Sequence, residues 1–564
     1  MYNMDRIWKE TGDFMKKLIA LFLALWMMLS VLPGCNGNTV PDPTPSATQP
    51  PAPSDSAATD DTTKYNKHLN YTLTDAQVTD FSAQLAQLEK LYMDNASLDA
   101  IDEAEEELEE LSEYINDQCS IANVIYCCDT TDKTASDRFL KSQEIGNQIA
   151  NDVMLSARRI YESDAPNKDY FFQDWTEAEM KKLMSYTEQV MELEQRNAEI
   201  LVAYRDLSDQ TLTSGMIPLY REMVVNNNKI AQIYGYDNYY TYAYELEYDR
   251  DYSSDKIAAM RGYVATYLAP LCTEAVSDFS DAYSGLTAVQ QMNFSGLMFA
   301  DYDSLGIDYV KLYIDSLPQE AREAMNKMFA QERVVFTDQE NAKEGAFTTL
   351  IGDSGFCYFG PGYQNMGTVI HELGHYYGAE EGDMYTIPLD LAETQSQGNE
   401  WMFTKFMEDH LNPKMYQGFL SYQLYETIVS TVVQMVVDEF EQRIYADPNV
   451  ADFTEADFNQ VMEDVCKKYG GVKYFADNIT DIQHYWRMVV VESPVYYISY
   501  AVSTMAALNI FTIAQQDYDK AMHIYCSLAE QDDYEDGFLG IIHEAGLPGP
   551  FDQQVYRDIY AIYQ

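Results

Sequence analysis

Two histidines and a glutamate lie close together near the middle of the chain. His371 and His375 are four residues apart, and Glu372 follows the first of them in the run His-Glu-Leu-Gly-His. Side chains four residues apart share one face of a helix, so two imidazoles at this spacing can bind one metal ion. Zinc takes neutral imidazole and carboxylate ligands and keeps one position open at a catalytic site. The spacing therefore predicts one zinc ion per chain, bound in part by His371 and His375.

Glu372 has the position of a general base. It follows the first predicted ligand and would lie beside a water molecule on the metal. Zinc lowers the pKa of such a water, Glu372 can accept the proton, and the hydroxide can attack a polarised carbonyl carbon. The alternative is an ordinary helix that carries two histidines. With seven histidines in the chain, a chance match to this motif has a probability on the order of one per cent.

A carboxylate on a following helix can complete the ligand set. Residues 389–401 are predicted to be helical, with Pro388 near the start of the helix. A metzincin would have a third histidine six residues after His375, and this chain has none. The long gap to Glu393, in the second helix, fits the gluzincin arrangement instead. Asp390, one turn before Glu393, is the alternative ligand.

The two motifs together resemble those of one family. His-Glu-Leu-Gly-His followed by Glu-Thr-x-Ser-x-x-x-Glu resembles the oligoendopeptidase F and thimet oligopeptidase family of zinc metallopeptidases. The resemblance implies that Glu393 is the third zinc ligand and that Glu400 is a supporting residue near the site. For Glu400 the alternative is a surface carboxylate. The likeness is strong over residues 365–400 and looser over the rest of the chain from about residue 70.

A tyrosine-rich segment near the C-terminus extends the resemblance. Residues 493–503 resemble a helix of this family, and also the helix of angiotensin-converting enzyme that bears two functional tyrosines three residues apart. The resemblance implies that Tyr500 donates a hydrogen bond to the developing oxyanion and that Tyr497 contacts substrate. Core packing is the alternative, because the chain has 46 tyrosines. Those relatives carry a histidine shortly upstream, which residues 487–492 lack; His484 or Arg487 could take its place.

Apolar residues recur at helical spacing over most of the chain and would position these side chains. Val78, Phe81, Leu85, Leu88 and Leu91 show the pattern, which continues over residues 98–115. Further helices are predicted over residues 136–161, 175–206, 219–233, 254–286 and 317–330, and again after the histidine motif, whose helix should end at Gly378. Strands are predicted only at residues 333–336 and 356–359. The predicted class is therefore mainly α, a large helical zincin-like peptidase with a small β-sheet beside the site; the family resemblance adds a deep substrate channel.

The N-terminus is predicted to be an export signal. Lys16 and Lys17 precede an apolar run from Leu18 to Leu32, which is shorter than the ~20 residues of a membrane span. Small Gly34 before Cys35 resembles the bacterial lipobox, so residues 1–34 would be a signal peptide, with Met15 as its true start, and Cys35 would be lipidated. An ordinary secretory peptide is the alternative. The protein would then be exported and lipid-anchored on the outer face of the cell membrane.

The remaining boundaries follow from composition. Residues 35–64 are rich in Pro, Thr, Ser and Asp and are predicted to be a disordered tether. Residues 65–564 form the predicted peptidase domain, with an N-terminal helical lobe over about 65–230 and a catalytic part over about 231–564.

Charge and cysteine content limit the function classes. Lys and Arg number 36 against 91 Asp and Glu, so the net charge is -55 and binding of nucleic acid is not expected. The acids are interpreted as solvated helix faces, with a preference for basic peptides as the alternative. Eight cysteines include no Cys-x-x-Cys pair. Apart from Cys35 we expect mostly buried free thiols, with a disulfide from Cys119 to Cys127 or Cys128 as the alternative.

These observations predict a monomeric zinc metalloendopeptidase that hydrolyses oligopeptides. A peptidyl-dipeptidase or carboxypeptidase-type zinc peptidase is one alternative. A catalytically weak, peptide-binding lipoprotein is another, and the missing upstream histidine is the reason to keep it.

Overall fold

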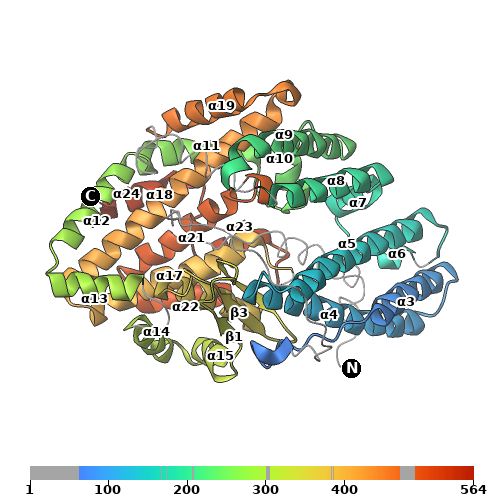
Figure 1. Cartoon of the computed structure of the whole chain (residues 1–564), viewed down its shortest axis with the longest axis horizontal. Helices are drawn as coiled ribbons and strands as arrows, with labels where there is room; N and C mark the ends of the chain where they lie inside the picture. Colours follow the sequence, from blue (N-terminus) through green and yellow to red (C-terminus); the bar gives the residue numbers. More distant parts are fainter. Residues whose placement is uncertain are drawn as a thin grey trace, which may run out of the picture.

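The computed structural model confirms a mainly helical chain with one small sheet (Figure 1). It describes residues 62–166, 168–172, 175–205, 207, 209–299, 305–382, 384, 386–470 and 490–563. The predicted signal peptide, Cys35 and most of the predicted tether lie outside the described residues, as do His484 and Arg487.

The elements before the sheet are all helical. They are η1 (Thr62–Lys64), α3 (Asp75–Met93), α4 (Leu98–Cys128), α5 (Lys133–Glu162), α6 (Lys168–Phe171), α7 (Glu177–Ser185), α8 (Glu188–Arg205), α9 (Asp209–Ile233), α10 (Tyr239–Tyr242), η2 (Ala243–Glu247), α11 (Ser254–Tyr263), η3 (Val264–Leu268), α12 (Leu271–Ser284), α13 (Ala288–Met298), α14 (Leu305–Ser316) and α15 (Gln319–Ala330). Of these, η2 and η3 are single π-helical turns.

The sheet and the C-terminal helices follow. They are β1 (Val334–Phe336), β2 (Ala346–Leu350), β3 (Gly355–Phe359), α16 (Met366–Glu381), α17 (Leu389–His410), α18 (Pro413–Ala446), η4 (Val450–Asp452), α19 (Glu455–Lys468), α21 (Ile498–Ala514), α22 (Tyr518–Ala529), α23 (Gly537–Glu544) and α24 (Gln553–Tyr563).

The three strands lie in the order β1-β3-β2. Strand β3 pairs in parallel with β1 and antiparallel with β2. Every residue of β3 is buried, which explains why its sequence, Gly-Phe-Cys-Tyr-Phe, is apolar without alternation. The two predicted strands are confirmed at β1 and β3, and β2 lies on the other side of β3 from β1.

Two large helical cores lie on different sides of the sheet. Helices α3, α4 and α5 pack together at one end of the molecule around a core that runs from Phe81 to Leu183 (Figure 1). A much larger core begins at Val190 and includes the long helices α16, α17, α18 and α21. The end of α4 joins the first core to the sheet through Val124 and Ile125, which lie in one cluster with Phe356 and Tyr358.

Several predicted helix boundaries were wrong. The predicted helix over 175–206 is divided between α7 and α8, because Thr187 begins a new helix: its hydroxyl accepts the Val190 N–H at 3.4 Å. The predicted helix over 254–286 is interrupted by the π turn η3 and by Pro270, which begins α12. The helix of the histidine motif does not end at Gly378 but continues to Glu381.

All seven cysteines beyond Cys35 are buried free thiols. The alternative disulfide from Cys119 to Cys127 or Cys128 is not formed, since all three residues lie on α4. Residues eight or nine apart on one helix are about 12 Å apart along its axis, and a disulfide needs Cα atoms within about 7 Å.

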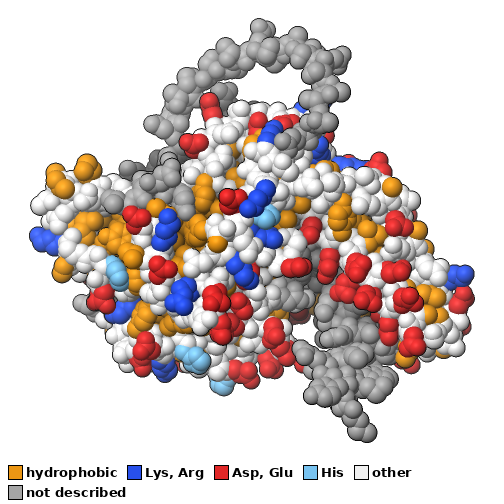
Figure 2. Space-filling model, turned by 90° about the horizontal axis from the view of Figure 1, so that it is seen from below, with side chains coloured by type: hydrophobic (Ala, Val, Ile, Leu, Met, Phe, Trp, Pro, Cys, Tyr) orange, Lys and Arg blue, Asp and Glu red, His pale blue; other side chains and the backbone are white. Residues whose placement is uncertain are grey.

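The acidic residues lie mainly on solvated faces. Figure 2 shows Asp and Glu side chains gathered on the part of one face where α3 to α5 lie. On α4, Glu103, Glu106 and Glu107 are exposed, whereas Ile101 and Leu108 are fully buried. No helix in the described part of the chain is both long and apolar enough to cross a bilayer.

A buried ion pair fastens α18 to the helices that precede it. Arg261 on α11 donates to Asp438 on α18, with Nε 2.8 Å from Oδ2, and their side chains are 3 % and 1 % exposed. The hydroxyls of Tyr240 and Tyr244 donate to the other Asp438 oxygen at 2.9 and 2.7 Å. Both charges are therefore matched inside the protein.

Replacement of Asp438 by Asn should leave Arg261 as an uncompensated buried charge. We expect the free energy of unfolding to fall by about 3–5 kcal/mol, because removal of one partner strands the other in a dry interior. Urea denaturation measures the change. The matched control is Glu332→Gln, which removes the partner of Lys67 in an exposed ion pair and should leave the midpoint unchanged. Equal midpoints for both variants would contradict a stabilising role for the buried pair.

Candidate metal centre

Helix α16 presents both histidines of the motif on one face. The Asn365 side chain caps the helix by accepting the Thr368 N–H at 3.1 Å. The helix is largely buried, so the His371 and His375 rings project into the interior with their centroids 5.0 Å apart.

Two glycines let α17 approach α16 closely. A Cβ atom on Gly374 would lie 2.6 Å from Ser396 Cα and 2.8 Å from the Gln395 carbonyl oxygen, which are both backbone atoms. A Cβ atom on Gly378 would overlap the Gln395 side-chain amide. Gly378 therefore serves helix packing, and α16 continues past it to Glu381.

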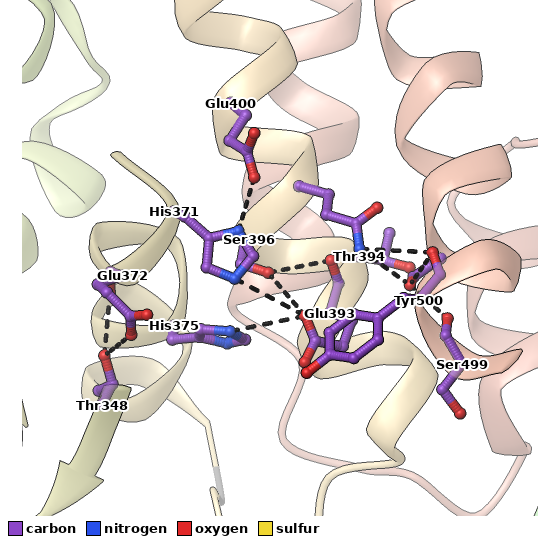
Figure 3. A network of polar contacts seen from close by, with 12 residues as sticks. Thr348, His371, Glu372, His375, Glu393, Thr394, Ser396, Glu400, Ser499 and Tyr500 are labelled. Atoms are coloured by element: carbon purple, nitrogen blue, oxygen red, sulfur yellow. Dashed lines mark hydrogen bonds and ion pairs between the residues drawn. The ribbon is translucent and has the colours of Figure 1, made fainter. Parts of the chain in front are cut away.

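This close contact brings Glu393 to the histidines. Its Oε2 lies 3.8 Å from Nε2 of His371 and 3.8 Å from Nε2 of His375 (Figure 3). One ligand atom from each of the three residues lies within 4.8 Å of the other two. Ligand atoms around a tetrahedral zinc ion are about 3.4 Å apart, so a small shift of these side chains would fit one ion. Across the described residues no other group of three His, Cys, Asp or Glu side chains converges in this way.

Burial shifts the pKa values of two of the three side chains, His375 and Glu393. Desolvation, with a smaller contribution from His371, holds the pKa of His375 well below its usual value, which keeps the ring neutral and able to ligate. Burial also raises the pKa of Glu393 to about 7. A carboxylate in such a dry place is costly without a cation beside it, and a metal ion would supply that charge.

Glu400 supports the first histidine. Its Oε1 lies 2.6 Å from Nδ1 of His371, so Nδ1 can donate a proton to the carboxylate and leave Nε2 free of hydrogen on the side of Glu393 (Figure 3). A carboxylate that receives the second ring N–H fixes the orientation of a metal-binding histidine. The alternative, a surface carboxylate, does not describe this side chain.

Thr348 forms a hydrogen bond with Glu372, a contact that the sequence did not predict. Its hydroxyl lies 2.8 Å from Oε2 of Glu372 and can donate to it. Thr348 belongs to the edge strand β2, and Glu372 is 1 % exposed. No spacing rule connects the two residues, because the register of β2 against β3 decides which side chain of the strand faces α16.

Helix α21 places Tyr500 next to the cluster. Figure 3 shows Tyr500 projecting from this helix toward Glu393. Gln397 on α17 links the two helices: its amide nitrogen lies 3.5 Å from the Tyr500 carbonyl oxygen, and its Oε1 accepts from Thr504 at 2.6 Å. Tyr497, at the start of α21, packs edge-on against Tyr500 with ring centroids 5.6 Å apart.

Asp390 is not part of the cluster. Although it lies one turn before Glu393, its carboxylate interacts with Arg250, Tyr252 and Ser499, and burial raises its pKa to about 6. The side chains of α17 one turn apart diverge here, so Asp390 faces the segment before α11 and the first turn of α21. The structure therefore places Asp390, the alternative ligand, outside the group formed by His371, His375 and Glu393.

Solved structures of peptidases share this architecture. PZ peptidase A with an inhibitor superposes with a TM-score of 0.71 at 17 % identity, over 88 % of this chain and 98 % of that one. A putative oligoendopeptidase F from Bacillus anthracis gives 0.67 at 15 % identity, over 87 % and 96 % of the two chains. The chain has the oligoendopeptidase F fold. A Pyrococcus furiosus carboxypeptidase is more distant, with a TM-score of 0.52 at 13 % identity over 87 % and 100 %.

No family model and no curated protein sequence matches the chain.

Replacement of Gly374 by Ala should separate α17 from α16. The new methyl group would meet backbone atoms of Ser396 and Gln395, which cannot rotate away. We expect a loss of about 1–3 kcal/mol in the free energy of unfolding and a fall of at least about tenfold in zinc affinity, because Glu393 would move from the histidines. Urea denaturation and competition with a chromophoric chelator measure the two effects.

Gly367→Ala is the matched control on the same helix. The nearest atom to a Cβ there is 3.4 Å away, so stability should be unchanged or rise by up to about 1 kcal/mol through helix propensity. Unaltered zinc affinity in Gly374→Ala would show that the close helix contact does not place Glu393.

Proposed function

We propose that the protein is a zinc-dependent metallopeptidase that hydrolyses oligopeptides. The observation that carries the proposal is the meeting of His371, His375 and Glu393 from two helices, with Glu372 beside them. The fold shared with solved peptidase structures supports the same activity. Zinc is the metal that best suits two neutral imidazoles and one carboxylate.

His371, His375 and Glu393 would hold the ion, with Glu400 fixing the first ring. A bound zinc ion would supply a Lewis acid that polarises a peptide carbonyl and lowers the pKa of water. Because the described residues offer three ligands there rather than four, a bound ion would keep a position for water or substrate.

Glu372 would move the proton. The Thr348 hydroxyl occupies one carboxylate oxygen, and that contact limits rotation of the side chain. The carboxylate can then accept a proton from the attacking water and pass it to the amine that leaves. Burial raises the pKa of Glu372, which makes the carboxylate a better base than an exposed glutamate.

Tyr500 and strand β2 would position the substrate. The Tyr500 hydroxyl is the proposed donor to the oxygen on which negative charge develops, with Tyr497 beside it as a substrate contact. Strand β2 pairs with β3 on one side and is one of the two edge strands of the sheet. An extended peptide could add to this edge and pass Glu372, as peptides do at other exposed sheet edges. The helical shell around the site favours oligopeptides over folded proteins.

Replacement of Glu372 by Gln should separate metal binding from catalysis. The variant should still bind one zinc ion per chain, because the ligands are intact, while kcat/KM for peptide cleavage falls by about 10²–10⁴-fold through loss of the base. Metal analysis and a fluorogenic peptide assay measure the two properties. The control is Glu381→Gln at the exposed end of the same helix, which should leave both unchanged.

Wild-type protein that binds zinc but cleaves no member of a broad peptide library would exclude the proposed activity. It would leave the peptide-binding alternative. If peptides are cleaved, mass spectrometry of the products decides the mode: internal cuts identify an endopeptidase, release of dipeptides a peptidyl-dipeptidase, and release of single C-terminal residues a carboxypeptidase. The last mode is kept because carboxypeptidases also share the fold.

The proposal includes export and a lipid anchor at Cys35, which rest on the sequence of the N-terminus. Replacement of Cys35 by Ala should move the protein from the membrane fraction to the soluble exported fraction, because the lipid attachment site is lost. Immunoblotting of the fractions, together with labelling by a fatty-acid analogue, measures this. Wild-type protein that takes up no label would exclude the anchor, although an ordinary secretory signal would remain.

A further inference from the structure

A strained turn lies directly before the helix that carries Tyr500. Val495 has φ of +61°, in the left-handed region, and its side chain is 1 % exposed. For a β-branched residue this conformation is rare, because Cβ crowds the backbone. Such a residue keeps the conformation only where its surroundings hold it there. The residues that contact this turn therefore identify the interactions that hold Val495 in its unfavourable conformation.

Glu441 of α18 holds the Val495 amide. One carboxyl oxygen accepts the Val495 N–H at 2.9 Å, and the side chain is fully enclosed. Burial raises the pKa of Glu441 well above its usual value, so the group can be a neutral acid that still accepts through an oxygen. The two residues are 54 positions apart in the chain, so this contact is tertiary.

Arg250 holds the carbonyl side of the same turn. Its Nη2 donates to the Val495 carbonyl oxygen at 2.9 Å and to the Ser499 hydroxyl at 3.0 Å. The guanidinium lies over the rings of Tyr244 and Tyr248, 4.6 and 4.4 Å from their centroids. These stacked rings restrict the plane in which Arg250 can donate.

Tyr248 adds a further contact at the neighbouring residue, where its hydroxyl donates to the Pro494 carbonyl oxygen at 2.8 Å. Pro494 and Val495 are thus fixed by three side chains from two distant segments. None of these side chains belongs to the metal cluster, whose ligands lie on α16 and α17. The contacts act on the start of α21, and hence on the direction in which Tyr500 leaves it.

We propose that Arg250 and Glu441 are positioning residues that hold the strained turn at Val495, and that this turn aims Tyr500 at the His371/His375/Glu393 cluster. The inference rests on the proposed function, since Tyr500 matters as a donor only if the site hydrolyses peptides. The strain itself does not depend on that function. A different turn would change the direction in which the first residues of α21 leave it, and a displacement of about 1 Å at a reacting group can cost about 10²-fold in rate.

The strain is tested by comparing the Tm values of two substitutions at Val495. At a positive φ glycine is tolerated better than alanine, whereas elsewhere alanine is the more stable choice. Thermal unfolding should therefore give Val495→Gly a higher Tm than Val495→Ala. Val491 is the matched control, since it is equally buried and has no positive φ; there the alanine variant should have the higher Tm. The same order at both positions would contradict the strained turn.

The positioning role is tested by rescue. Glu441→Leu removes the acceptor of the Val495 N–H and should lower kcat by about 10–100-fold, with KM and one zinc per chain unchanged. Glu441→Gln keeps an acceptor oxygen and should retain wild-type kcat. Addition of Val495→Gly to Glu441→Leu should restore most of kcat, because glycine adopts the turn without being held. Full kcat in Glu441→Leu, or no rescue by Val495→Gly, would overturn the proposal.

Arg250→Lys provides a second variant if Glu441→Leu does not fold. Lysine keeps the charge near Asp390 but cannot reproduce the forked contacts, so kcat should fall and Val495→Gly should again restore it. Failure of the wild type to cleave any peptide would reject the proposed function alone, because the order of Tm values at Val495 and Val491 needs no activity.

Discussion

The contact between α16 and α17 at Gly374 is the constraint on which the rest of the site depends. The two helices touch backbone to backbone, with no room for a single methyl group. Only at this separation can a carboxylate on α17 reach two imidazoles on α16. A side chain at Gly374 would increase the distance between the helices, and Glu393 is too short to compensate for the movement of its own backbone. The candidate metal ligands are therefore placed by helix packing rather than by a loop.

Bringing these groups together buries polar atoms, and each needs a partner. Asn399 of α17 joins its helix to α16 and α14, since its amide donates to the Ile370 carbonyl oxygen at 2.7 Å and its oxygen accepts from the Tyr313 hydroxyl at 2.8 Å. Glu400 is the partner of the His371 ring, and the Thr348 hydroxyl is the partner of the Glu372 carboxylate. Each of these contacts offsets a desolvation cost of a few kcal/mol. A network of this kind is rigid, which suits a candidate metal site.

Two sides of the site are held in different ways. The metal side rests on close helix packing, and Gly374 permits it. The side of Tyr500 rests on a backbone turn that is unfavourable by itself and is held by Arg250 and Glu441. The close packing of α16 and α17 stabilises the fold and also builds the site. The turn at Val495 is unfavourable by itself, so its cost must be offset by other contacts in the core. At the site, the strained residue Val495 lies on the side that would meet the substrate.

The sequence by itself determined what depends on neighbours in the chain. The spacing of His371 and His375 is a property of one helix, and the helical class follows from apolar periodicity. Glu393 was selected over Asp390 only through a family resemblance, because both lie on α17 and packing decides which one faces α16. Local rules read Gly378 as a helix end, although its role is contact with Gln395. The register of β2, which places Thr348, and the contacts of Val495 with Arg250 and Glu441 join distant segments, so only the tertiary structure could decide them.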